Sequence, residues 1–116
     1  MIIEAVIIKY LQDANIQGIG QKVYAETPVD EPNEYIKVEK TGGPMEDGIV
    51  HATIAIQSYS ATSLLRAAEI NEAMKDLMEY LPDYSNVYGC TLNTDYNYTD
   101  PDTRMYRYQA VFVIDY

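Results

Sequence analysis

The sequence predicts an α+β fold, in which an antiparallel (mixed) four- to five-stranded sheet has two helices packed on one face. Two segments with helical apolar spacing and several segments with alternating apolar residues are the observations behind this prediction. The expected order of elements is α-β-β-β-α-β-β. A chain of 116 residues can bury one hydrophobic core without disulfides or metals, so a single domain over residues 1–116 is expected.

The first element is expected to be a helix. Apolar side chains near the start of the chain recur at i, i+3, i+4, i+7, i+8 and i+11, and polar residues lie opposite. The β-branched content would also fit a strand, but the helical spacing is the more complete pattern. The segment Asn15 to Gly20, with two glycines, then ends the helix. The apolar face consists of Ile3, Val6, Ile7, Tyr10, Leu11 and Ala14.

Three strands are expected between the two helices. A short strand can form at Lys22 to Ala25, and a second at Tyr35 to Lys40. The segment between them, Thr27 to Asn33, contains two prolines and is predicted to be a loop. The third strand, Ile49 to Tyr59, alternates apolar and polar residues. Between the second and third strands, Thr41 to Gly48 (TGGPMEDG) is predicted to be a turn-rich, mobile loop.

The second helix begins after the long strand. Ser60 or Thr62 is expected to cap it, and Pro82 is expected to end it. Its apolar face consists of Leu64, Ala67, Ile70, Met74, Leu77, Met78 and Leu81.

Two further strands form a hairpin that completes the chain. Val87 to Tyr96 is the first, with Cys90 on the side of the helices, and Asn97 to Thr103 is the hairpin loop. Arg104 to Tyr116 returns beside it with a period of two, so the terminus is expected to be tied into the sheet.

Composition narrows the possible functions. The net charge of −10, from 8 basic and 18 acidic residues, argues against binding to nucleic acid, which needs clustered Lys and Arg. The acidity indicates either solubility or a surface that repels polyanions or docks on a basic partner. The 12 tyrosines fit either protein interfaces or simple strand propensity. No apolar run is long enough for a membrane span, and the N-terminus lacks the features of a signal peptide.

The sequence contains few residues in patterns typical of catalytic sites, so neither a catalytic residue nor a cofactor is expected. The single cysteine, Cys90, excludes an internal disulfide and a cysteine-based zinc site. Strand parity places Cys90 and His51 on opposite faces of the sheet, which argues against a thiol–imidazole pair.

No metal site is predicted, although one loop resembles the start of a calcium loop. Asp95, Asn97, Asp100 and Asp102 supply the type of oxygen that calcium prefers. The sixth position is not glycine and the twelfth is not glutamate, so Asx-turns are the preferred interpretation.

The layout resembles the small tail-terminator or tail-completion (head–tail joining) proteins of long-tailed bacteriophages. The resemblance covers nearly the whole chain, without a diagnostic residue. The segments that carry it are the N-terminal helix, the proline-containing segment before EYIKVEK, the strand IVHATIAIQSYS, the helix in SATSLLRAAEINEAMKDLMEYL and the closing strand RMYRYQAVFVIDY.

The resemblance implies a structural role without catalysis. Such a protein forms a homo-oligomeric ring, usually a hexamer, at the head-proximal end of the tail tube. The ring ends tube polymerisation and joins the tail to the head–tail connector protein. DNA only passes through the lumen, and no membrane is involved. The implied location is the tail of a phage or prophage virion that is assembled in the host cytoplasm.

Two exposed segments would then contact the tube or the connector. Two alternatives stay open, namely a small α+β ligand-binding or enzymatic domain and another head–tail connector component. The candidate contact residues are Thr41, Gly42, Gly43, Pro44, Met45, Glu46, Asp47, Gly48, Asn97, Tyr98, Asp100 and Asp102.

Overall fold

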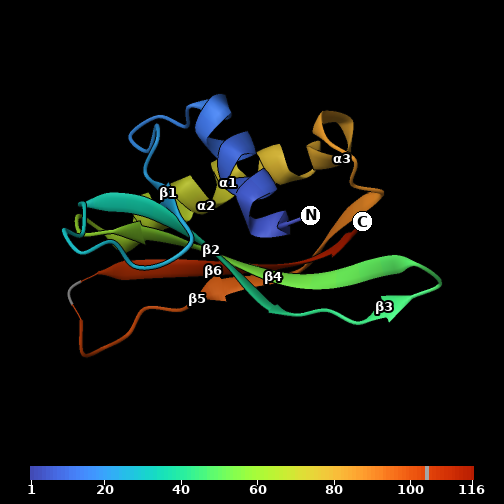
Figure 1. Cartoon of the computed structure of the whole chain (residues 1–116). Helices are drawn as coiled ribbons and strands as arrows, with labels where there is room; N and C mark the ends of the chain where they lie inside the picture. The colour runs from blue at the N-terminus through green and yellow to red at the C-terminus, as the bar shows by residue number, and fades with distance from the viewer. Residues whose placement is uncertain (104) are drawn as a thin grey trace.

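The computed structural model describes residues 1–103 and 105–116, and it confirms the α+β fold. Within these residues, one six-stranded sheet carries three helices on a single face (Figure 1). Arg104, the first residue of the predicted returning strand, lies outside the described residues. The helices are α1 (Ile3–Ala14), α2 (Leu64–Met78) and α3 (Leu81–Tyr84). The strands are β1 (Val23–Tyr24), β2 (Glu34–Gly42), β3 (Met45–Glu46), β4 (Ile49–Ser60), β5 (Gly89–Asn97) and β6 (Tyr106–Asp115).

The sheet is mixed, with the long strands β4 and β6 inside it. Its order is β1-β2-β4-β6-β5, and β3 pairs with β4 outside this path. The β1–β2 pair is parallel, whereas the other pairs are antiparallel. The β4–β6 register runs without a shift from His51↔Asp115 to Ser60↔Tyr106. The two ends of the β4–β6 pair therefore define the two ends of the sheet along the strand direction.

The predicted first helix is confirmed. Ile3, Ile7 and Leu11 of α1 are fully buried, one helical turn apart along a single face. Asn15 follows with a left-handed backbone (φ 54°), and its N–H bonds to the carbonyl of Gln12. Asparagine tolerates this conformation better than most residues. The cap therefore turns the chain away from the helix toward β1.

The core lies between the helices and one face of the sheet. Alternate residues of β4 and β6 point into it, as the period-two pattern predicts. The buried side chains from these two strands are Ala52, Ile54, Ile56, Ala110, Phe112 and Ile114. The α2 face that covers them contributes Ala67, Ile70, Met74 and Met78.

The ends of α2 differ from the prediction. Ser63 is the N-cap, and its Oγ accepts the N–H of Arg66 at 3.1 Å. The prediction of Ser60 or Thr62 as the cap is wrong. Instead, the Ser60 hydroxyl accepts the backbone N–H of Thr62 at 3.1 Å and so organises the turn before the helix.

Pro82 does not end the second helix. The helix α2 already ends at Met78, and Pro82 lies in the first turn of the short helix α3. The first turn of a helix has no internal partner for its N–H groups, so a proline there loses no hydrogen bond. The residue begins a helix rather than stopping one.

Mutation of two buried serines on β4 to alanine should change the free energy of unfolding in opposite directions. Ser58 and Ser60 both have no exposed surface, but the Ser58 hydroxyl has no hydrogen-bond partner among the described residues. We expect Ser58→Ala to raise the free energy of unfolding by about 1 kcal/mol, because an unsatisfied polar group is removed. Ser60→Ala should lower it by about 1 kcal/mol, because two backbone N–H groups lose their acceptor. Urea unfolding of both variants measures the difference, and equal effects would contradict this assignment.

Candidate functional site

The first predicted contact segment is an ordered β-ribbon rather than a loop. Strand β2 continues to Gly42, and β3 pairs with β4 through Met45↔Val50 and Glu46↔Ile49. The connecting residues Asp47 and Gly48 both have positive φ, 51° and 78°. Two positive φ values in a two-residue connection are the signature of a type I′ hairpin turn. The prediction of a loop over this whole segment is therefore wrong.

The base of this hairpin is fastened to the sheet. The carbonyl of Pro44 accepts the N–H of His51 at 2.9 Å. Gly43 lies so close to β4 that an added Cβ would be 2.9 Å from the Cα of Ala52. His51 also faces two carboxylates, with Nδ1 2.6 Å from Asp115 and Nε2 3.9 Å from Glu46. These contacts fix where the hairpin leaves the body of the protein.

The outer part of the hairpin is available for contacts. All side chains from residue 39 to residue 48 are exposed. Met45 is 70% exposed, and it is followed by Glu46 and Asp47. The hairpin therefore presents one flexible apolar side chain beside two carboxylates, a combination suited to a protein contact.

The second predicted segment is held by local side-chain hydrogen bonds. Asn97, which ends β5, accepts the N–H of Thr99 at 3.0 Å, and Asp100 accepts the N–H of Asp102 at 2.9 Å. These are Asx-turns, as predicted. Asp95 lies on the helix side of β5 and pairs with Lys75 at 3.0 Å. It is therefore engaged away from the loop, and the described residues contain no group of three ligands suited to a metal ion.

The two predicted contact segments lie at opposite ends of the molecule. The hairpin is at the end of the sheet where His51 pairs with Asp115, and the second loop is where Ser60 pairs with Tyr106. Figure 1 shows the hairpin and the loop extending from opposite sides of the body. The longest dimension of the described chain is 44 Å. The candidate residues thus form two surfaces rather than one site.

The sheet face away from the helices carries an aromatic cluster that the sequence did not reveal. The Tyr35 and Tyr59 rings stack with their centroids 4.3 Å apart. The Arg107 guanidinium lies 5.6 Å from the Tyr59 ring and 4.5 Å from the Tyr98 ring. Burial raises the pKa of the Tyr35 hydroxyl, which also donates a hydrogen bond to Glu31. The cluster joins three segments distant in sequence, because Tyr98 and Arg107 are neighbours in one hairpin, so a local pattern could not have predicted the whole cluster.

A buried polar pair continues this face toward the hairpin. Nε2 of Gln57 donates to Oε1 of Gln109 at 2.6 Å, and Nε2 of Gln109 donates to the Tyr96 hydroxyl at 2.6 Å. Gln57 also donates to Glu39 at 3.1 Å. These bonds link β2, β4, β6 and β5 on the sheet face that no helix covers. Internal hydrogen bonds therefore occupy several of the polar side chains on this face.

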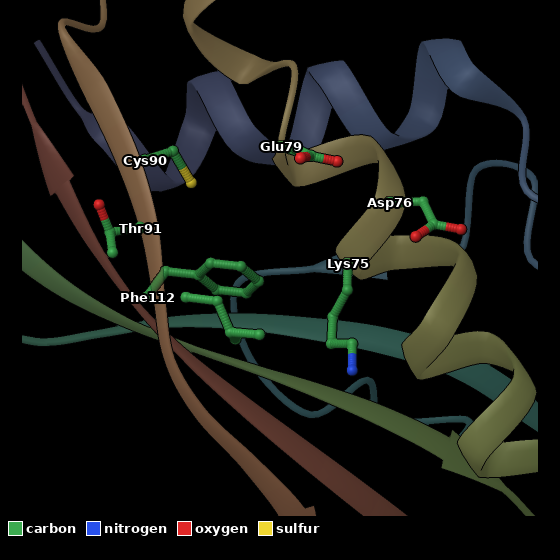
Figure 2. Close-up of a pocket in the computed structure, with 7 residues that line it drawn as sticks. Lys75, Asp76, Glu79, Cys90, Thr91 and Phe112 are labelled. Carbon is green, nitrogen blue, oxygen red and sulfur yellow. The ribbon is translucent and has the colours of Figure 1, made fainter.

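A groove of about 400 Å³ separates α2 from the edge strand β5. Figure 2 shows Lys75, Asp76 and Glu79 on the helix side, and Cys90, Thr91 and Phe112 on the sheet side. Burial raises the pKa of the Cys90 thiol to about 11. His51 lies on the other sheet face, so the predicted separation of cysteine and histidine is confirmed. A thiol of this kind is a poor nucleophile.

Comparisons with known proteins show a fold relationship. No family model matches the chain. No curated protein matches it either. A similar solved structure is a chain of the virion of a native gene transfer agent (GTA) particle, with a TM-score of 0.71. The match covers 97% of this chain and 92% of that chain at 15% sequence identity. At this identity the likeness shows a shared fold. Among the described residues, no helix is long and apolar enough to cross a membrane.

The Asp47–Gly48 turn should be sensitive to a side chain at its second position. Gly48→Ala places a Cβ in open space but at a φ of +78°, so we expect a loss of about 1 kcal/mol in the stability of the hairpin. Gly42→Ala is the matched control, because Gly42 also faces open space and needs no positive φ. Amide hydrogen exchange over residues 45–51 measures the effect. Equal exchange in the two variants would contradict the type I′ turn.

The Cys90 thiol should react slowly in the folded protein. Its pKa is raised from 9.0 to about 11, so at neutral pH the thiolate fraction is about a hundredfold below that of the unfolded chain. Iodoacetamide labelling of native and denatured protein measures this ratio, and the native rate should rise as the pH approaches 11. Faster labelling of the native protein would indicate an activated cysteine.

Proposed function

We propose that this chain is a structural component of a phage-like virion and acts as the tail terminator. The observation that carries the proposal is the fold shared with a gene transfer agent virion chain over 97% of this sequence. In this role the protein forms a ring at the head-proximal end of the tail tube and joins the tail to the head connector. The order of elements that resembles tail-completion proteins supports the same role.

The arrangement of contact surfaces supports a protein that meets two neighbours. The hairpin around Met45 and the loop after Asn97 lie at opposite ends of a body 44 Å long. A ring subunit that sits between a tube and a connector needs two such surfaces. In a ring, each subunit also contacts the next through two different patches. We propose that the hairpin contacts the tube or the connector. A hexameric ring is part of the same proposal.

The charge of the chain is compatible with DNA passage. A net charge of −10 gives a surface that repels the phosphate backbone. A lumen lined by such subunits would let DNA pass without binding it. We therefore propose that DNA is a passing cargo rather than a ligand.

Tail length tests the proposal directly. Particles produced without this protein should carry tails of irregular and excessive length in negative-stain electron microscopy, because tube polymerisation is not stopped. Normal-length tails that fail to join heads would favour another head–tail connector component. Complete virions would overturn both structural roles and favour the small ligand-binding or enzymatic domain, for which the groove beside Cys90 is the candidate pocket.

The hairpin contact can be tested within the same assay. We expect Met45→Asp to abolish tail termination, because it places a charge at the most exposed apolar side chain of the hairpin. Val29→Asp is the matched control, since Val29 is fully exposed and lies outside both contact segments. Both variants should keep the melting temperature of the parent. Equal activity of the two would contradict a role for the hairpin.

A further inference from the structure

Strand β5 has the longest uncovered edge in the described part of the sheet. Eight of its nine residues pair with β6, and the other side of the strand has no partner strand among the described residues. On the opposite edge the two-residue strand β1 covers β2 only at Ile36 and Lys37, and the uncovered part of β2 includes the charged Glu39 and Lys40. Strand β3 has two residues and follows Pro44. Short strands and prolines are common ways in which proteins protect sheet edges from other chains. The other described edges are thus short, charged or next to a proline, whereas β5 begins with a long uncharged stretch.

Two of the usual protections, a bulge at Asn93 and an inward-facing charged residue, Asp95, lie in the second half of β5, and the first half has neither. From Gly89 to Thr94 the strand has neither a charged residue nor a proline, in a chain with 22% charged residues. Leu92 in its middle is 42% exposed. An uncharged edge with an exposed apolar residue is a template for pairing with another strand.

The groove beside this edge adds side-chain selectivity. Leu92 and Phe112 supply apolar walls. Asp76 on α2 and Glu79 at its C-cap supply two carboxylates (Figure 2). Lys75, the basic residue of the groove, is engaged with Glu72 at 2.8 Å and with Asp95 at 3.0 Å. Asp76 and Glu79 have no ion-pair partner among the described residues. The groove therefore favours an apolar side chain accompanied by a positive charge.

We propose that β5 accepts an additional strand from a partner protein, and that this strand carries an apolar residue next to a lysine or arginine. Main-chain hydrogen bonds to β5 would supply affinity, the groove would hold the apolar side chain, and Asp76 and Glu79 would bind the base. Pairing of β5 with β5 of a second copy is disfavoured, because it would bring the same carboxylates of two chains of charge −10 together. The inference rests on the proposed function in one respect: the partner is a neighbouring virion protein.

Titration of the isotope-labelled full chain with a peptide tests the proposal. The probe is a short blocked peptide of alternating valine and threonine with one central lysine, and its twin carries glutamate instead. We expect saturable amide shifts confined to Cys90–Asn97 and the groove, and about fivefold tighter binding of the lysine peptide. Substituting both Asp76→Asn and Glu79→Gln should abolish the preference for lysine.

Two leucine variants separate edge pairing from unspecific binding. Leu92→Lys should abolish the shifts, because it places a charge on the open edge. Leu65→Lys on α2 is the control, since Leu65 is 73% exposed and does not line the groove. Equal binding by both variants, equal binding of the two peptides, or no shift at millimolar peptide would overturn the inference.

The tail-length assay distinguishes this inference from the proposed function. If strand addition serves assembly, Leu92→Lys should fail to complete particles, whereas Leu65→Lys should complete them. Normal particles with Leu92→Lys would overturn the inference and leave the tail-terminator role intact. Normal particles without the protein would overturn the role itself.

Discussion

The pairing of β4 with β6 is the constraint on which the rest of the structure depends. Side chains alternate along a strand, so the unbroken register from His51↔Asp115 to Ser60↔Tyr106 assigns every residue of both strands to one face. One face receives the apolar set that the helices cover. The same register brings the hairpin to one end of the sheet and the loop before β6 to the other. A slip by one residue would exchange the buried and exposed sets and expose the core.

Much of the fold could be predicted because its signals are local. The α1 face and the alternation of β4 and β6 are periodic patterns within one element. The Asp47–Gly48 turn also had a local signal, since Asp-Gly between extended segments favours a type I′ hairpin. The prediction of a loop over Thr41 to Gly48 does not use this signal. Pro82 is a related case, because a proline can begin a helix as well as end one.

The side-chain environment of β5 could not be predicted because it depends on a bulge. The register with β6 shifts between Leu92 and Thr94, so the parity that places Cys90 toward the helices is reversed beyond that point. Asp95 consequently faces α2 and pairs with Lys75. A one-residue irregularity of this kind has no reliable signal in a single sequence. It removes Asp95 from the oxygen cluster that the loop sequence suggested.

The uncovered sheet face shows how distant residues determine which surfaces remain for partners. The Tyr35–Tyr59 stack and the Gln57–Gln109 bond join strands that are far apart in sequence, and they occupy this face with internal contacts. The helices occupy the other face. Exposed apolar groups on the hairpin and on the β5 edge therefore lie at the periphery of the sheet. A subunit with that distribution can contact different neighbours at its ends and its edge without losing the packing that holds it together.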